Sequence, residues 1–262
     1  MNLLLVEPGE VGDGGEIALG GARAAHLLNV LRVTPGQTVR IGVLDGALGI
    51  GEVRSVGAGR VVLHGTFETA VPPRPPLDVL LALPRPKVMA RLWAQLAAMG
   101  VGHIIITNAA RVERNYFDAH ALAPARYRPL LIEGLQQARD TRLPRVTIHR
   151  RFKVLIEDEL DRYFPDGLRL VADPSAAAST GDVVRRGRAD RVLLAIGPEG
   201  GWNDFERGLL AAHGFKAISL GPRTLRTDTA CIALIAVVSG SAGTYRTCEP
   251  TEPTEPNEPS ER

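Results

Sequence analysis

A proline-dense segment, VPPRPPLD at residues 71–78, separates two stretches of the chain that have different hydrophobic patterns. Before it, short β-branched runs such as QTVRIGVLDG and RVVLHGTFET are separated by glycines. After it, apolar runs of strand length alternate with longer segments of helical periodicity. Because closely spaced prolines form a stiff, extended linker, this segment predicts a boundary between two domains.

Residues 1–71 are predicted to form a small β-barrel domain. Their repeated glycines and β-branched residues are typical of short antiparallel strands. One helix is expected over GARAAHLLNVLR, with Ala25 and Leu28 on its apolar face. The next residue at helical spacing is Leu31 or Arg32.

Residues 72–246 are predicted to form an α/β domain. LDVLLALP is expected to be a buried strand, followed by a helix over KVMARLWAQLAAMG and a second strand over GHIIITN. Val88, Leu92 and Leu96 lie four residues apart in that helix and predict its buried face. Such a β-α-β unit favours a parallel sheet, and further strands are expected at LRLVADP, RVLLAIG and FKAISLG.

Three further helices are predicted in this domain. The first lies around residues 124–140. The second covers NDFERGLLAAHG, where Asn203 and Glu206 have the spacing of a capping box and Gly214 suits the helix end. The third covers TDTACIALIAVVSGSAG and is hydrophobic on nearly all sides, so we expect the core or a second subunit to cover both sides of it.

Composition narrows the class of protein. The N-terminal run MNLLLVEPGE does not have the length of a signal peptide, and the longest apolar run, 230–238, is too short to cross a bilayer. We therefore expect a soluble, cytoplasmic protein. Cys231 and Cys248 are the only cysteines and the six histidines are scattered, so neither a disulfide framework nor a metal site is expected.

Charge is distributed unevenly along the chain. The Glu-Pro repeat at 247–262, which carries five Glu and one Arg, is predicted to be a disordered tail. The preceding residues 1–246 hold 30 basic and 24 acidic side chains, and almost all of the basic ones are arginine. Arginine suits phosphate contacts and base stacking, although a GC-rich genome produces the same bias.

Two turns of the same construction indicate a ligand site. AIGPEGGWND, at residues 195–204, and SLGPRTLRTDT, at 219–229, each place glycine and proline between a predicted strand and a helix. Glycine lets the backbone approach a ligand, proline holds the loop shape, and open α/β sheets bind ligands at the carboxyl ends of their strands. A third strand end, VADPS at 171–175, is expected nearby. Neither a P-loop, a dinucleotide fingerprint nor a nucleophile elbow is present.

The segments IGPEGGWNDFE and LGPRTLRTDTA resemble the paired signature segments of the RsmE family. Members are SPOUT-superfamily, S-adenosylmethionine-dependent methyltransferases acting on N3 of one uridine in small-subunit (16S) ribosomal RNA. HLLNVLRVTPGQTVRIGVLDG is similar to the family's PUA-like RNA-binding barrel, and RLWAQLAAMGVGHIIITNAARVERN and GLQQARDTRLP match further blocks. The resemblance extends to about Arg246.

The resemblance implies a trefoil-knotted α/β methyltransferase domain, a homodimer, and ribosomal RNA or the assembling small subunit as partner. It also implies a metal-free reaction with S-adenosylmethionine as methyl donor. The residues implied for the donor pocket are Val171, Ala172, Ile196, Gly197, Pro198, Gly200, Gly201, Leu220, Gly221, Leu225, Arg226, Thr227, Thr229 and Ala230.

Two side chains are candidate catalytic residues. Arg226 is expected to stabilise the developing uridine anion or to bind phosphate, or else to form an ordinary ion pair with Asp228 or Glu199. Glu199 is a candidate base for the N3 proton, or else a cap of the following helix. The candidate RNA-binding residues, each alternatively a solvated surface charge, are Arg23, His26, Arg32, Arg111, Arg114 and Arg139.

The chain departs from the family pattern at three positions. Gln95 and Gln136 stand where the family usually has acidic residues, and Asp228 stands where it has Glu. Two alternatives therefore stay open. One is a SPOUT methyltransferase with another RNA target, and the other is a catalytically silent RNA-binding or ribosome-assembly factor.

Overall fold

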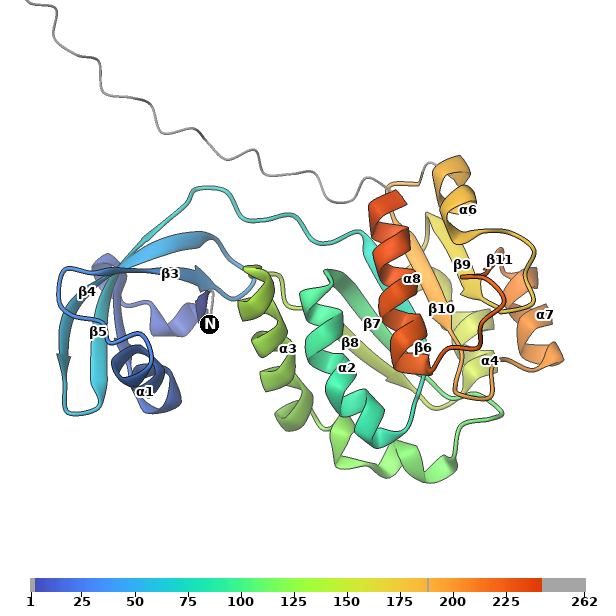
Figure 1. Ribbon diagram of the computed structural model, residues 1–262, viewed down its shortest axis with the longest axis horizontal. Coiled ribbons are helices and arrows are strands. Elements are labelled where there is room, and N and C mark those ends of the chain that lie inside the picture. Colours follow the sequence, from blue (N-terminus) through green and yellow to red (C-terminus); the bar gives the residue numbers. More distant parts are fainter. Residues whose placement is uncertain (1–2, 188, 242–262) are drawn as a thin grey trace, which may run out of the picture.

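The computed structural model describes residues 3–187 and 189–241, which form two sheets (Figure 1). The acidic tail at 247–262 and Cys248 lie outside the described residues. The first sheet has five strands in the order β1-β3-β4-β5-β2, and they are β1 (Leu4–Val6), β2 (Glu16–Leu19), β3 (Thr38–Val43), β4 (Leu48–Gly57) and β5 (Arg60–Phe67).

Pairing in the first sheet is mostly antiparallel, as expected, but β1 pairs with β3 in parallel. The difference has a topological reason. The long connection from β1 to β3, which contains β2, lets β3 lie beside β1 in the same direction, whereas a short hairpin would force the opposite direction. Two 3₁₀ turns, at Pro8–Glu10 and Asp13–Gly15, lie between β1 and β2.

The helix of this part, α1 (Gly21–Asn29), is shorter and turned relative to the prediction. It buries Ala24 and Leu27 against the sheet, whereas Ala25 is exposed and Leu28 only half-buried. The two buried residues have the predicted i, i+3 spacing, but each lies one position before the residue that was predicted. The helix ends before Leu31, which is 46 % exposed.

The second sheet has six parallel strands in the order β11-β9-β10-β6-β7-β8. All five residues of β10 are buried, which is typical of a parallel strand covered on both faces. The strands are β6 (Leu77–Ala82), β7 (Val101–Thr107), β8 (Arg145–His149), β9 (Leu168–Ala172), β10 (Val192–Ile196) and β11 (Lys216–Ile218).

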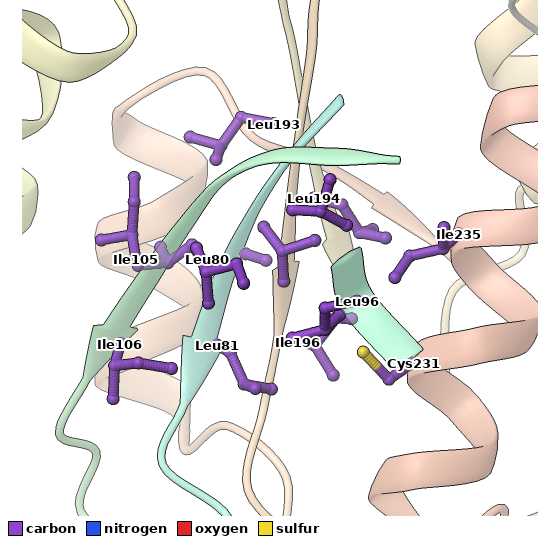
Figure 2. Packing of buried hydrophobic residues seen from close by; sticks show 14 of the residues in the cluster. Leu80, Leu81, Leu96, Ile105, Ile106, Leu193, Leu194, Ile196, Cys231 and Ile235 are labelled. Carbon is purple, nitrogen blue, oxygen red and sulfur yellow. The ribbon is translucent and has the colours of Figure 1, made fainter. Parts of the chain in front are cut away.

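Three helices lie side by side on one face of this sheet, namely α2 (Pro86–Ala98), α3 (Pro124–Ala138) and α8 (Thr227–Ser241) (Figure 1). The predicted face of α2, with Val88, Leu92 and Leu96, is buried. In the close view of Figure 2, Leu194 and Ile196 of β10 lie towards Cys231 and Ile235 of α8. Side-chain alternation along β10 thus supplies both faces of the core.

The remaining elements connect these layers. The predicted capping box at the start of α7 is confirmed, because Asn203 and Glu206 bond each other's backbone N–H groups. The remaining helical elements are a 3₁₀ turn at Arg114–Asp118, another at His120–Leu122, α4 (Phe152–Val154), a π-helical turn at Leu155–Glu159, α5 (Leu160–Tyr163), α6 (Thr180–Gly187) and α7 (Asp204–Ala212).

Contacts of α3 and the residues after it join the two sheets. Arg128 on α3 donates to both carboxylate oxygens of Glu7, at 2.7 and 3.0 Å. The Thr141 hydroxyl donates to the carbonyl oxygen of Gly46 at 2.6 Å. Leu5, which lies in β1, and Leu44, which directly follows β3, belong to the apolar cluster of the second sheet. The proline segment is therefore not the only connection between the two sheets.

Close packing of α2 and α3 depends on a single glycine. A Cβ atom at Gly134 would overlap the carbonyl oxygen of Ala94 and approach the Ala97 Cβ at 3.0 Å. Gly134 therefore allows the backbones of the two helices to come together more closely than a larger residue would permit.

Asp78 lies near the amino-terminal end of β6, at the end of the sheet opposite to the strand carboxyl ends. It is buried and forms an ion pair with Arg191. Burial raises the pKa of the Asp78 carboxyl, and the charge of Arg191 opposes that rise. The Arg191 guanidinium also lies 4.8 Å from the ring centroid of Phe164. The positive charge of Arg191 therefore offsets part of the cost of removing the Asp78 carboxylate from water.

We expect Arg191→Ala to destabilise the fold more at pH 8 than at pH 5. Without Arg191 the pKa of Asp78 rises further, so ionising Asp78 above that pKa costs folding energy, whereas protonated Asp78 at low pH does not. The loss at pH 8 should be about 1–3 kcal/mol, below the range for fully buried pairs because Arg191 is partly exposed.

Urea unfolding at both pH values measures this difference. Arg162→Ala is the matched control because Arg162 is exposed. An equal loss of stability at pH 5 and pH 8 would contradict the assignment.

Candidate functional site

A recess opens at the carboxyl ends of β9, β10 and β11, where the sequence predicted a ligand site. It combines backbone from the two glycine-proline turns with apolar side chains and two carboxylates. The residues lining it are Ala172, Asp173, Pro174, Ile196, Gly197, Pro198, Glu199, Gly201, Ile218, Ser219, Leu220, Gly221, Arg223, Thr224, Leu225, Thr227, Ala230 and Leu234.

The turn after β10 is packed against a buried tryptophan. A Cβ atom at Gly197 would lie 3.2 Å from both the backbone nitrogen and the indole nitrogen of Trp202, so the glycine is needed for close approach. The turn closes through a 2.8 Å hydrogen bond from the Gly201 N–H to the Pro198 carbonyl. Trp202 in turn packs on Phe152, with ring centroids 5.3 Å apart.

The turn after β11 is held by its own serine. The Ser219 hydroxyl oxygen accepts a 3.0 Å hydrogen bond from the Gly221 N–H. Gly221 has φ +106°, a backbone conformation that favours glycine. This turn leads through residues 222–226 into α8, so it faces the same recess as the turn after β10.

Two carboxylates, Asp173 and Glu199, and one guanidinium, Arg223, line the recess. Desolvation raises the pKa of Asp173, but hydrogen bonds from Ser175 and the charge of Arg207 outweigh it and hold the pKa below its ordinary value. The other carboxylate, Glu199, accepts a 3.1 Å hydrogen bond from the Arg85 backbone N–H through Oε1. The recess therefore suits a ligand that carries an apolar ring together with charged groups of both signs.

A second recess adjoins the first. Both are lined by Glu199, Thr224, Leu225 and Thr227, so these residues form the border between them. The other residues lining the second recess are Arg85, Val88, Arg226 and Asp228. The arrangement offers space for a second molecule beside a ligand held by the glycine-proline turns.

The charges of the second recess are only partly paired. Asp228 accepts a 2.9 Å hydrogen bond from Arg91, which lowers the pKa of the Asp228 carboxyl. Arg226 Nε lies 3.8 Å from the other Asp228 oxygen, and the Arg226 side chain is 77 % exposed. Arg91 is thus the main partner of Asp228, and the Arg226 guanidinium is available to a ligand.

Glu206 joins the turn after β10 to the loop after β7. Its side chain is buried, with the residue 3 % exposed. One carboxylate oxygen accepts a 2.6 Å hydrogen bond from the Ala110 N–H, and the other accepts one of 2.9 Å from the Asn203 N–H. Arg111, the next residue after Ala110, donates to the Gly200 carbonyl oxygen. The two loops are therefore tied together at two points.

The residues predicted for the donor pocket are not all placed at the recess. Those that line it are Ala172, Ile196, Gly197, Pro198, Gly201, Leu220, Gly221, Leu225, Thr227 and Ala230. Four do not: Val171 is buried in β9, Gly200 faces Arg111, Arg226 lines the second recess and Thr229 is exposed on α8. Glu199 lines both recesses.

The predicted RNA-binding residues fall in different places. Arg23 and His26 line a cavity between α1 and α3, where Arg23 forms an ion pair with Glu10. Arg111 and Arg114 lie on the loop after β7. Two others have a left-handed backbone conformation: Arg32 lies in the segment between α1 and β3, and Arg139 is the C-cap residue of α3.

The two glutamines that depart from the family pattern lie away from the site. Gln95 is exposed on α2, and Gln136 lines the cavity between α1 and α3. Neither lines either recess. Among residues 3–187 and 189–241, no group of three or more His, Cys, Asp or Glu is placed to hold a metal, and no helix is long and apolar enough to span a membrane.

Several residues of the recesses were missed from the sequence. The signal available for five of them was their position in the segments 171–175 and 219–229, which the sequence predicts as strand ends at the site; they are Asp173, Pro174, Ser219, Arg223 and Thr224. Leu234 and Ile218 were predicted only as parts of a helix and of a strand. For Arg85 the signal was the end of another predicted strand, because LPRP at 83–86 directly follows β6.

Sequence comparison matches this chain to a family. A family model described as an RNA methyltransferase domain matches residues 72–239. The "Ribosomal RNA small subunit methyltransferase E" of Treponema pallidum is 29 % identical over 244 residues, covering 89 % of this chain and 88 % of that protein. The protein of the same name from Mycobacterium tuberculosis is 29 % identical over 222 residues, covering 83 % and 84 %.

Solved structures share the fold. The small subunit methyltransferase E of Neisseria gonorrhoeae, bound to S-adenosyl methionine, gives a TM-score of 0.74 at 22 % identity and covers 92 % of this chain and 97 % of that one. A protein from Legionella pneumophila, in complex with the same cofactor, gives a TM-score of 0.70 at 24 % identity and covers 92 % and 97 %.

We expect Glu206→Ala to loosen both loops of the site. The substitution leaves the N–H groups of Ala110 and Asn203 without their acceptors, so we expect a loss of about 2–4 kcal/mol in unfolding free energy. Hydrogen-deuterium exchange should increase at 108–114 and 197–203 together. Glu133→Ala is the control, because Glu133 is exposed on α3. Faster exchange in only one of the loops would contradict the proposed link.

Proposed function

Because this chain belongs to the RNA methyltransferase domain family, and its resemblance to the RsmE family is confirmed, we propose that it methylates N3 of a uridine in small-subunit ribosomal RNA. The methyl donor is S-adenosylmethionine. The observation that carries the proposal is that two glycine-proline turns line one recess and that Arg226 and Glu199 line the adjoining one.

The first recess fits the methyl donor. Ile196, Ile218 and Leu234 supply apolar surface for an adenine ring, and the turn backbones supply N–H and C=O groups for its polar edge. Asp173 and Glu199 suit the positive charges of the donor's sulfonium and ammonium groups. When bound, this donor supplies a methyl group attached to a positively charged sulfur.

The chain's own residues position and activate the acceptor. The neutral imide of uracil is a poor nucleophile, so N3 must lose its proton. Glu199 Oε1 is engaged by the Arg85 N–H, which leaves Oε2 to accept that proton. Arg226 stabilises the negative charge that then develops on the uracil ring. Holding both reactants in line contributes about 7–11 kcal/mol to the barrier reduction, as in other two-substrate sites.

Further features follow from the same family. Residues 1–71 form a PUA-like RNA-binding domain, and residues 72–246 a SPOUT domain with a trefoil knot. The two sheets with separate apolar clusters support the division. Arg23, His26, Arg32, Arg111, Arg114 and Arg139 contact the RNA, in naked form or in the assembling subunit, and the protein acts in the cytoplasm.

The protein acts as a homodimer through the outer face of α8. Leu220, Leu225 and Val237 are large apolar side chains that are each more than a third exposed, and α8 is apolar on nearly all sides. A second copy would remove this surface from water beside the donor recess.

We expect Arg226→Ala to abolish methylation and to leave donor affinity within about threefold of the wild type. Arg226 lines only the recess assigned to the acceptor. The variant and the wild type would be expressed in a strain lacking the gene. Mass mapping of small-subunit ribosomal RNA should show one methyluridine restored by the wild type and not by the variant, and calorimetry measures donor binding.

Arg162→Ala serves as control because Arg162 is exposed and is distant in sequence from both glycine-proline turns. Normal methylation by Arg226→Ala would remove Arg226 from the mechanism. If the wild type bound no donor, the chain would be a catalytically silent RNA-binding factor. A methyl group on a different RNA would establish the other target.

We expect Val237→Asp to convert the dimer to monomers, because a charge at this position would be buried in the interface. Analytical ultracentrifugation measures the state. Val56→Asp is the matched control, since Val56 on β4 is equally exposed at 36 %. A wild-type protein that sediments as a monomer would refute the proposed dimer.

A further inference from the structure

We infer that Arg85 is a specificity residue that, together with Glu199 and Arg226, reads the edge of the acceptor base and selects uracil over cytosine. This inference rests on the proposed function. Three observations carry it: the side chains that line the second recess, the way the backbone fixes Arg85, and the hydrogen-bonding pattern that the three side chains offer.

The second recess has the composition of a base-reading site. Arg85, Glu199 and Arg226 all line it, and it borders the donor recess through Glu199, Leu225 and Thr227. An acceptor held there lies directly beside the methyl donor. Asp228 also lines the recess, but its carboxylate is engaged by Arg91. The charged groups left to meet a ligand are therefore two guanidiniums and one carboxylate.

Backbone constraints fix the position of Arg85. It follows β6 and stands as the residue before α2, between Pro84 and Pro86. Proline restricts both its own backbone and that of the preceding residue, so this segment has few alternative conformations. The Arg85 N–H also donates to Glu199 Oε1 at 3.1 Å, which ties the two ligand-facing residues together.

The Arg85 guanidinium is available to a ligand. The residue is exposed, and within residues 3–187 and 189–241 no acceptor is recorded for its side chain. Its charge acts on Tyr116: the pKa of Tyr116 is raised by desolvation and by its hydrogen bond to Glu113, and Arg85 opposes that rise. Arg91, by contrast, is held by Asp228.

These groups match the edge of uracil. That edge presents an acceptor at O2, a donor at N3–H and an acceptor at O4. Two guanidinium donors and one carboxylate acceptor offer the complementary set. Cytosine presents two acceptors and an amino donor, so its N3 lone pair would face the carboxylate and its amino group a guanidinium. Sites built around such hydrogen bonds strongly reject a ligand that leaves them unmet.

Binding of free nucleotides tests the inference without methyl transfer. Saturation-transfer NMR would compare uridine and cytidine 5′-monophosphates on the wild type, Arg85→Ala, Arg85→Lys and Lys87→Ala. Lys87 is the matched control, since it is an exposed cation in the first turn of α2 that does not line the recess. We expect the wild type and Lys87→Ala to prefer the uridine nucleotide, Arg85→Ala to lose the preference, and Arg85→Lys to recover part of it.

Kinetics give a second readout. With small ribosomal subunits from a strain lacking the gene, Arg85→Ala should lower kcat/KM by about 10- to 100-fold, the usual effect of losing one specific base contact. Affinity for S-adenosylmethionine should stay within threefold, because Arg85 does not line the donor recess. Lys87→Ala should match the wild type.

Equal or absent signals for the two nucleotides on the wild type, or an Arg85→Ala variant that keeps the preference, would overturn the inference. So would an Arg85→Ala variant with the kcat/KM of Lys87→Ala. A wild type that transfers no methyl group to the subunits would instead count against the proposed function, because the nucleotide preference is measured independently of transfer.

Discussion

The arrangement of the site depends on one buried carboxylate. Glu206 accepts hydrogen bonds from the backbones of Ala110 and Asn203, which belong to loops at the ends of two different strands. A buried carboxylate is stable only when its oxygens are hydrogen-bonded, so the side chain and the loops constrain each other. The turn that carries Glu199 is thereby fixed relative to the loop that carries Arg111. The hydrogen bonds of Glu206 therefore help to determine the shape of both recesses.

The parallel sheet explains why two recesses lie together. In a parallel sheet the carboxyl ends of all strands lie at the same end of the sheet. Because the strand order is β11-β9-β10-β6, the segments that carry Asp173, Glu199 and Arg85 follow neighbouring strands. Glycine and proline then give each connection a fixed shape. Glu199 lines both recesses, so the proton acceptor that we propose lies where the two reactants would meet.

The sequence predicted elements with strong periodicity or a specific local signal. The strands at the centre of the second sheet, the buried face of α2 and the capping box at Asn203 are confirmed, because each is encoded by residues close together in the chain. The parallel pairing of β1 with β3 was not foreseen, since it depends on contacts distant in sequence. The site turns were located from glycine and proline. Arg85 was not predicted as a site residue, because its place in the second recess arises only when the end of β6 lies beside Glu199.

The glycine at position 134 has an effect beyond its own helix. It sets the spacing between α2 and α3, and α3 also carries Arg128, which holds Glu7 of the other sheet. The residue before α2 is Arg85, so α2 is connected directly to the second recess. A bulkier residue at position 134 would therefore tilt α3 away from α2 and the site. The tilt would grow with distance from the crossing point and displace the far sheet most. Gly134 thus influences how the first sheet is aligned with the second sheet, although the two sheets have no strand in common.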